Sequence, residues 1–77
     1  MHGTDSAGQL LSGREVALLT LVARGLSNHE IGGVLHLSAH TIKHGVERLS
    51  QKIGVRNRVE LAAWAGSNRH YRPTIEE

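Results

Sequence analysis

The chain has 77 residues, which suits one small domain, and it has no cysteine, so disulfides and thiolate metal sites are excluded. The net charge is +2. One Trp, one Tyr and no Phe provide too few aromatic rings for a surface that stacks single-stranded bases. No apolar run approaches the roughly 18 residues of a membrane span, and no charged-then-apolar leader opens the chain, so we expect a soluble cytoplasmic protein.

We expect one domain over residues 10–66 between two flexible tails. Residues 1–9 are small, polar and aperiodic. Residues 67–77 lose the apolar periodicity and include Pro73. The tails are therefore not expected to contribute to the core.

The first helix is predicted to begin after Ser12, because Ser12 and Glu15 have the S-x-x-E spacing of a capping box. Gly25 is expected to end it in a left-handed conformation. Its apolar residues cover most of the circumference, so the helix should lie at the centre of the core; they are Val16, Leu18, Leu19, Leu21, Val22 and Ala23.

A second helix is predicted to follow at once, with Ser27 as its N-cap and Glu30 three residues later. We expect Gly32 to allow close packing against another helix. The alternative is that this glycine arose by drift and has no specific role in a short helix. The predicted apolar face consists of Ile31, Val34 and Leu35.

The third helix, residues 38–53, is predicted to begin at the N-cap Ser38 and to end at Gly54. Its apolar residues follow one 3.6-residue period: Ile42, Val46, Leu49 and Ile53. A fourth helix is predicted over roughly 56–65. Two short helices joined by a tight turn and braced by an apolar first helix form a helix-turn-helix, so the predicted fold class is an all-α bundle of four helices.

The face of the third helix opposite its apolar residues is polar. At 100° per residue it presents His40, His44, Glu47 and Gln51, with Lys43 and Arg48 at its flanks and Thr41 and Lys52 near the core border. Between residues 43 and 58, five cations against one acid give a charge of +4. This is the geometry of a helix that enters the major groove of duplex DNA, and the alternative is an ordinary solvated face.

Residues 11–65 resemble the LuxR-type helix-turn-helix domain. The matching residues are Leu11-Ser12, Arg14-Glu15, Leu19, Ala23, Gly25-Leu26-Ser27-Asn28, Glu30-Ile31, Leu35, Ser38, Thr41-Ile42-Lys43, Val46, Lys52, Gly54-Val55 and Arg58. The resemblance implies a bacterial transcription regulator that binds double-stranded DNA as a dimer. A stand-alone GerE-like protein and the C-terminal domain of a response regulator remain alternatives.

The resemblance also implies roles for single residues. Lys43, His44 and Glu47 occupy positions that face the major groove, and Thr41 and Arg48 occupy positions that touch DNA or its backbone. Phosphate contacts are implied for the start of the second helix, with additions from the start of the fourth. The expected DNA-contacting set is Ser27, Asn28, Ser38, His40, Thr41, Lys43, His44, Glu47, Arg48, Lys52, Arg56 and Arg58.

Three residues depart from what the resemblance leads us to expect. The family usually has a side chain at position 45 and Ala at position 32, where this chain has glycines. Gly45 either lets the helix approach a neighbour or the DNA backbone, or weakens a regulator that needs a partner. Glu47 would repel phosphates, but it can accept a hydrogen bond from a cytosine amino group.

The fourth helix is apolar on two sides, with Val59, Ala62 and Ala63 on one side. Because the core can cover only one side, we expect the other to form a homodimer or heterodimer interface. The family dimerises through this helix, and Trp is a frequent hot-spot residue. The expected interface residues are Leu61, Trp64 and Ala65, unless the chain's own tail covers Trp64.

The alternative function is a helix-turn-helix module that binds RNA polymerase or another regulator. An enzyme is not expected, because no nucleophile, base and orienting group fall together. No cofactor and no metal are expected either. His36, His40 and His44 recur at every fourth residue, but no acidic or thiolate ligand stands ready to complete a zinc site.

Overall fold

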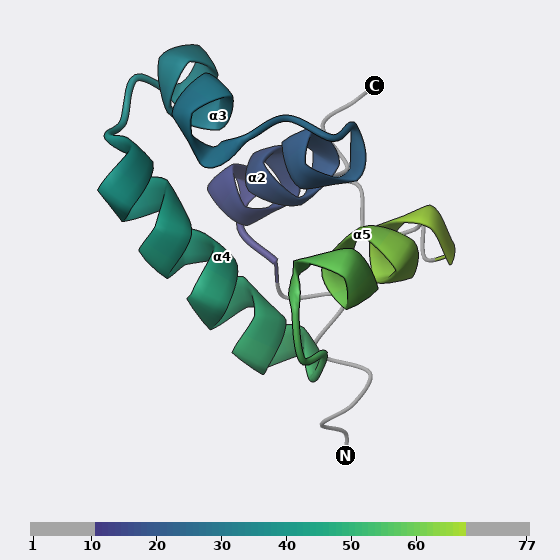
Figure 1. Cartoon of the computed structure of the whole chain (residues 1–77). Helices are drawn as coiled ribbons and strands as arrows, with labels where there is room; N and C mark the ends of the chain where they lie inside the picture. The colour runs from purple at the N-terminus through teal and green to yellow at the C-terminus, as the bar shows by residue number, and fades with distance from the viewer. Residues whose placement is uncertain (1–10, 68–77) are drawn as a thin grey trace.

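The computed structural model describes residues 11–67, and these form helices without any strand, which confirms the predicted all-α class. In chain order the helices are α2 (Gly13–Ala23), α3 (Asn28–Leu35), α4 (Ala39–Ile53) and α5 (Arg58–Ser67) (Figure 1). The predicted tails lie outside the described residues, except that Ser67 belongs to α5.

Reciprocal capping boxes begin α2 and α3, as predicted. The Ser12 hydroxyl accepts the Glu15 N–H at 3.1 Å, and the Glu15 carboxylate accepts the Ser12 N–H at 2.9 Å. Ser27 and Glu30 repeat this arrangement at 3.1 and 2.8 Å. Each box satisfies N–H groups that a helix start would otherwise leave unpaired.

Three of the described helices are followed by a residue in the left-handed backbone conformation. Gly25 and Gly54 have φ angles of +88° and +94°, as predicted for the residues that stop the first and third helices. His36 ends α3 with φ of +61°, which the sequence did not indicate. The chain can therefore turn sharply between α3 and α4 without a glycine.

The start of α5 differs from the prediction by two residues. The helix begins at Arg58 because the Asn57 side chain accepts the Glu60 N–H at 2.9 Å. Glu60 in turn accepts the Arg56 N–H at 2.8 Å. The Asn57 and Glu60 spacing is the same kind of capping signal that marks the first two helices, and it could have been found in the sequence.

The core gathers around α2, as its apolar circumference predicted, with α4 and α5 packed against it. Val34 was wrongly assigned to this core and is 54% exposed. In this helix of eight residues, Ile31 and Leu35 lie on the side that faces the core. Val34 is rotated about 60° from Ile31 around the helix axis, away from Leu35. The buried apolar residues are Val16, Leu18, Leu19, Val22, Ile31, Ile42, Val46, Leu49, Leu61 and Ala65.

Gly32 makes a close approach, although to the turn that follows α3 more than to another helix. A Cβ atom at this position would overlap the carbonyl oxygen of Leu37 and would lie 3.5 Å from the Ala39 nitrogen. The Leu37 N–H donates to the Gly32 carbonyl at 2.9 Å, which holds the turn in place. Gly33, the next residue, faces open space.

Arg58 joins the start of α5 to the start of α3. Its guanidinium donates to the Asn28 side-chain oxygen at 2.6 Å and to the Leu26 carbonyl at 2.5 Å. The group is partly buried, so these bonds satisfy acceptors that have limited access to water. Arg58 therefore has a structural task that charge alone does not reveal.

The two adjacent glycines of α3 should respond differently to the same change. We expect Gly32→Val to lower the free energy of unfolding by about 2–3 kcal/mol, because the new side chain must displace turn backbone. Gly33→Val should change it by less than about 0.5 kcal/mol, because that position is open. Urea denaturation followed by circular dichroism measures both, and equal effects would contradict the assigned packing.

Two nearby arginines provide a second comparison. We expect Arg58→Gln to cost about 1–3 kcal/mol of stability, because partly buried acceptors lose their donor. Arg56→Gln should cost less than about 0.5 kcal/mol, since its side chain is 87% exposed and lies 3.6 Å from the Glu60 carboxylate. If chemical denaturation gives both variants wild-type stability, Arg58 does not hold α5 to α3.

Candidate nucleic-acid interface

Helix α4 has one buried side and one exposed side, and the residues divide as its period predicted. Ile42, Val46 and Leu49 are buried against the bundle. The opposite face is exposed along its whole length and carries His40, Lys43, His44, Glu47, Arg48 and Gln51. We call these six residues the outer face of α4.

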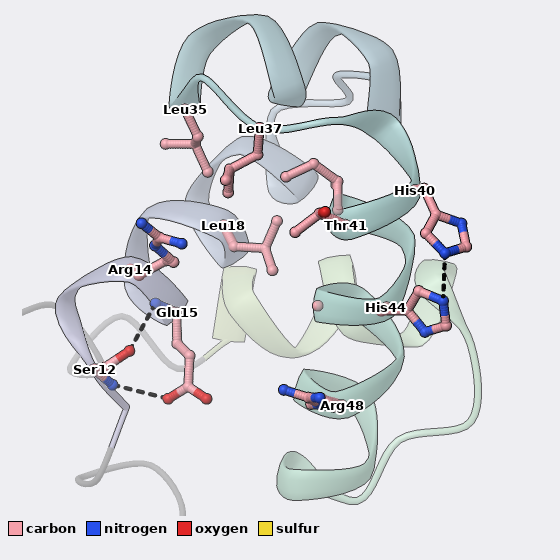
Figure 2. A pocket seen from close by; sticks show the side chains of 12 residues that line it. Ser12, Arg14, Glu15, Leu18, Leu35, Leu37, His40, Thr41, His44 and Arg48 are labelled. Atoms are coloured by element: carbon pink, nitrogen blue, oxygen red, sulfur yellow. Dashed lines mark hydrogen bonds between the residues drawn. The ribbon is translucent and has the colours of Figure 1, made fainter.

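Charged and titratable groups are close together on the outer face. The Nε2 atoms of His40 and His44 lie 3.1 Å apart, one helical turn from each other (Figure 2). The Nδ1 atom of His44 lies 3.7 Å from the Glu47 carboxylate. Lys43 and Arg48 remain as exposed cations on either side of this group.

Two serines of the expected DNA-contacting set cap helices instead of presenting free hydroxyls. Ser38 accepts the Thr41 N–H at 3.0 Å and donates its own hydrogen to the Thr41 hydroxyl at 2.9 Å. Ser27 is occupied by its capping box with Glu30. Any contribution of these serines to anion binding must therefore come through the helix starts that they organise.

Lys52 lies in an ion pair that the sequence did not reveal. Its ammonium nitrogen is 2.9 Å from the Glu15 carboxylate, 37 residues away on α2. Burial by itself would raise the pKa of Glu15, but hydrogen bonds from the Ser12 backbone and from Lys52 outweigh it and hold that pKa below its ordinary value. The pair ties the last turns of α4 to the first turn of α2.

The expected set therefore separates into residues that face outward and residues whose side chains cap a helix or join two helices. Arg56 is exposed near the start of α5 and joins the outward group. Those held within the domain by side-chain bonds are Ser27, Asn28, Ser38, Thr41, Lys52 and Arg58.

Gly45 allows α4 to approach α2 closely. A Cβ atom at this position would lie 3.1 Å from a methyl carbon of Leu18, tighter than an ordinary contact. Beside it lies a cavity of about 390 Å³, whose lining includes Leu18, Leu37, Arg14 and Arg48. Figure 2 shows the two histidines on the side of α4 away from Leu18. Of the explanations left open by the sequence, the approach to a neighbouring helix is the one this contact supports.

The two apolar sides of α5 differ in exposure, and the side expected to form the interface is largely buried in the chain's own core. Leu61 and Ala65 are 0% and 3% exposed and belong to the core of their own chain, so they have no surface left for a dimer interface. Trp64 is half-buried and packs against the same core. Val59, by contrast, is 78% exposed, and Ala63 is exposed one turn later.

Within residues 11–67, no three side chains among His, Cys, Asp and Glu come together in a way that could hold a metal ion. In the same part of the chain, no helix combines the length and the apolar character needed to cross a bilayer. The outer face of α4 gathers six exposed polar and charged residues on one helix.

Comparison with known proteins agrees with this geometry. Residues 9–65 match the family model described as "Bacterial regulatory proteins, luxR family". The chain is 39% identical over 67 residues to the CsgBAC operon transcriptional regulatory protein of Escherichia coli K12, covering 87% of this chain and 30% of that protein. It is 33% identical over 57 residues to the response regulator protein VraR of Staphylococcus aureus Mu3, covering 74% of this chain and 27% of that protein. The chain thus spans less than a third of these relatives, and it belongs to the luxR family of bacterial regulatory proteins.

Proposed function

We propose that this chain is the DNA-reading part of a dimeric transcription regulator and that α4 enters the major groove. The observation that carries the proposal is the division of α4 into a buried apolar seam and an exposed polar face. A seam that fixes the helix against its bundle leaves the other side free to contact a groove of about 12 Å width.

The charges of the outer face suit a duplex. Lys43, Arg48 and Arg56 are exposed cations that can pair with phosphates. His44 and Glu47 lie between them and can meet base edges. A carboxylate accepts hydrogen bonds and donates none, so the Glu47 side chain favours a cytosine amino group as its partner. The names of the two relatives, a transcriptional regulatory protein and a response regulator, support the same function.

We further propose that dimers form through the exposed side of α5, around Val59 and Ala63. An exposed valine beside small residues lets a second helix approach closely without displacing the chain's own core. A cytoplasmic, nucleoid-associated location follows from this function.

The alternative function is a module that binds RNA polymerase or another regulator. The exposed Val34 on α3 is the residue that favours this alternative.

The salt dependence of duplex affinity and the removal of single basic side chains test DNA binding. We expect affinity for a duplex to fall with a log–log salt slope of about −0.9 per phosphate contact. Lys43→Ala should weaken binding and reduce that slope by about 1. Arg24→Ala, which removes the same charge from the exposed end of α2, should leave the slope nearly unchanged. Fluorescence anisotropy with a duplex chosen from random sequences measures all three, and a flat salt profile would favour the protein-binding alternative.

The two exposed valines test the dimer. Val59→Asp places a charge in the proposed interface and should weaken self-association by at least about tenfold. Val34→Asp makes the same change on α3 and should not affect it. Sedimentation velocity, with and without duplex, distinguishes monomers from dimers. Wild-type association by Val59→Asp would exclude this side of α5 as the interface.

A further inference from the structure

The histidine pair on α4 brings two exposed imidazole rings into direct contact. The Nε2 atoms of His40 and His44 are 3.1 Å apart, the ring centroids are 4.4 Å apart, and the rings are inclined at 75°. Both side chains are exposed on the outer face, and both residues also line the edge of the cavity beside α2 (Figure 2). One Nε2 must act as the acceptor in this contact, so at least one of the two rings is unprotonated at Nε2.

A metal ion fits between these nitrogens. Zinc–imidazole distances are about 2.0–2.1 Å. With an N–metal–N angle between square-planar and tetrahedral, the two nitrogens would lie about 2.9–3.4 Å apart. The observed separation of 3.1 Å falls within this range. Two imidazoles one helical turn apart can therefore take up an ion with only small side-chain rotations.

We propose that His40 and His44 bind a divalent transition-metal ion of the Zn²⁺, Ni²⁺ or Cu²⁺ type through their Nε2 atoms. Imidazole is a preferred ligand for these ions. Binding through Nε2 requires the proton of His44 to reside on Nδ1, and the Glu47 carboxylate 3.7 Å from that atom favours this tautomer. Glu47 thus acts as a positioning residue for His44.

The site has two protein ligands. The described residues bring no third His, Cys, Asp or Glu to the same point, so water fills the other coordination positions in the free protein. Lys43 and Arg48, the nearby cations, oppose the ion's charge and keep the affinity moderate. The metal site does not depend on DNA binding, so its absence would leave the proposed function intact.

Titration of the free protein with Zn²⁺ at pH 7.5, followed by side-chain NMR of the histidines, tests the site. The ring signals of His40 and His44 should shift together and saturate at one ion per chain, with ¹⁵N shifts that report Nε2 coordination. Those of His29 and His36, which are also exposed, should not follow the same curve. Unmoved His40 and His44 signals at saturating Zn²⁺, or equal shifts at all four rings, would overturn the proposal.

Variants separate coordination from a simple hydrogen bond between the rings. His40→Gln and His44→Gln should each weaken Zn²⁺ binding in calorimetry by at least about tenfold. His36→Gln should leave it unchanged. Because both pair residues are exposed, circular dichroism should show wild-type helicity for every variant. Wild-type affinity in His40→Gln would show that the pair is only a hydrogen bond.

Discussion

The packing of Ile42, Val46 and Leu49 against the bundle fixes the position of every other residue on α4. Successive residues of a helix are rotated by about 100°, so once three of them are buried the rest have no freedom to turn. Helices shorter than about 12–15 residues are marginal in isolation. The outer face therefore exists because the shared core exists, and folding and display of the candidate DNA-contacting side chains are a single event.

Residues of the same type have different tasks in this domain. Arg58 is partly buried and bonded to α3, whereas Arg56, two residues earlier, is largely exposed. Lys52 is paired with Glu15, whereas Lys43 projects from the outer face. The sequence alone marks all four positions alike as basic. The difference arises from neighbours that are distant in sequence, and only the fold brings them together.

Local signals in the sequence were sufficient for most of the fold. Capping boxes, one clean apolar period and the glycines after α2 and α4 placed three of the four helices, because each signal acts within one turn of backbone. The orientation of α5 could not be obtained in this way. Both of its sides are apolar, and the choice between them depends on the space beside α2 that Leu61 and Ala65 fill.

The outer face of α4 followed from periodicity, but its internal contacts did not. The spacing of His40 and His44 places them one turn apart, yet the approach of their Nε2 atoms depends on side-chain rotation, which sequence does not specify. The pairing of Lys52 with Glu15 likewise joins two helices whose relative position is a property of the whole bundle.

The contact between Gly45 and Leu18 has a consequence for how such a regulator could diverge. A residue of any greater volume at position 45 would move α4 away from α2 by a few tenths of an ångström or displace the leucine methyl group. Such a shift would change the depth and tilt at which the helix meets its target while leaving every outward side chain the same. In a DNA-binding role, the preference of the domain for one target over another could therefore change through this contact between two helices, as well as through the outward side chains.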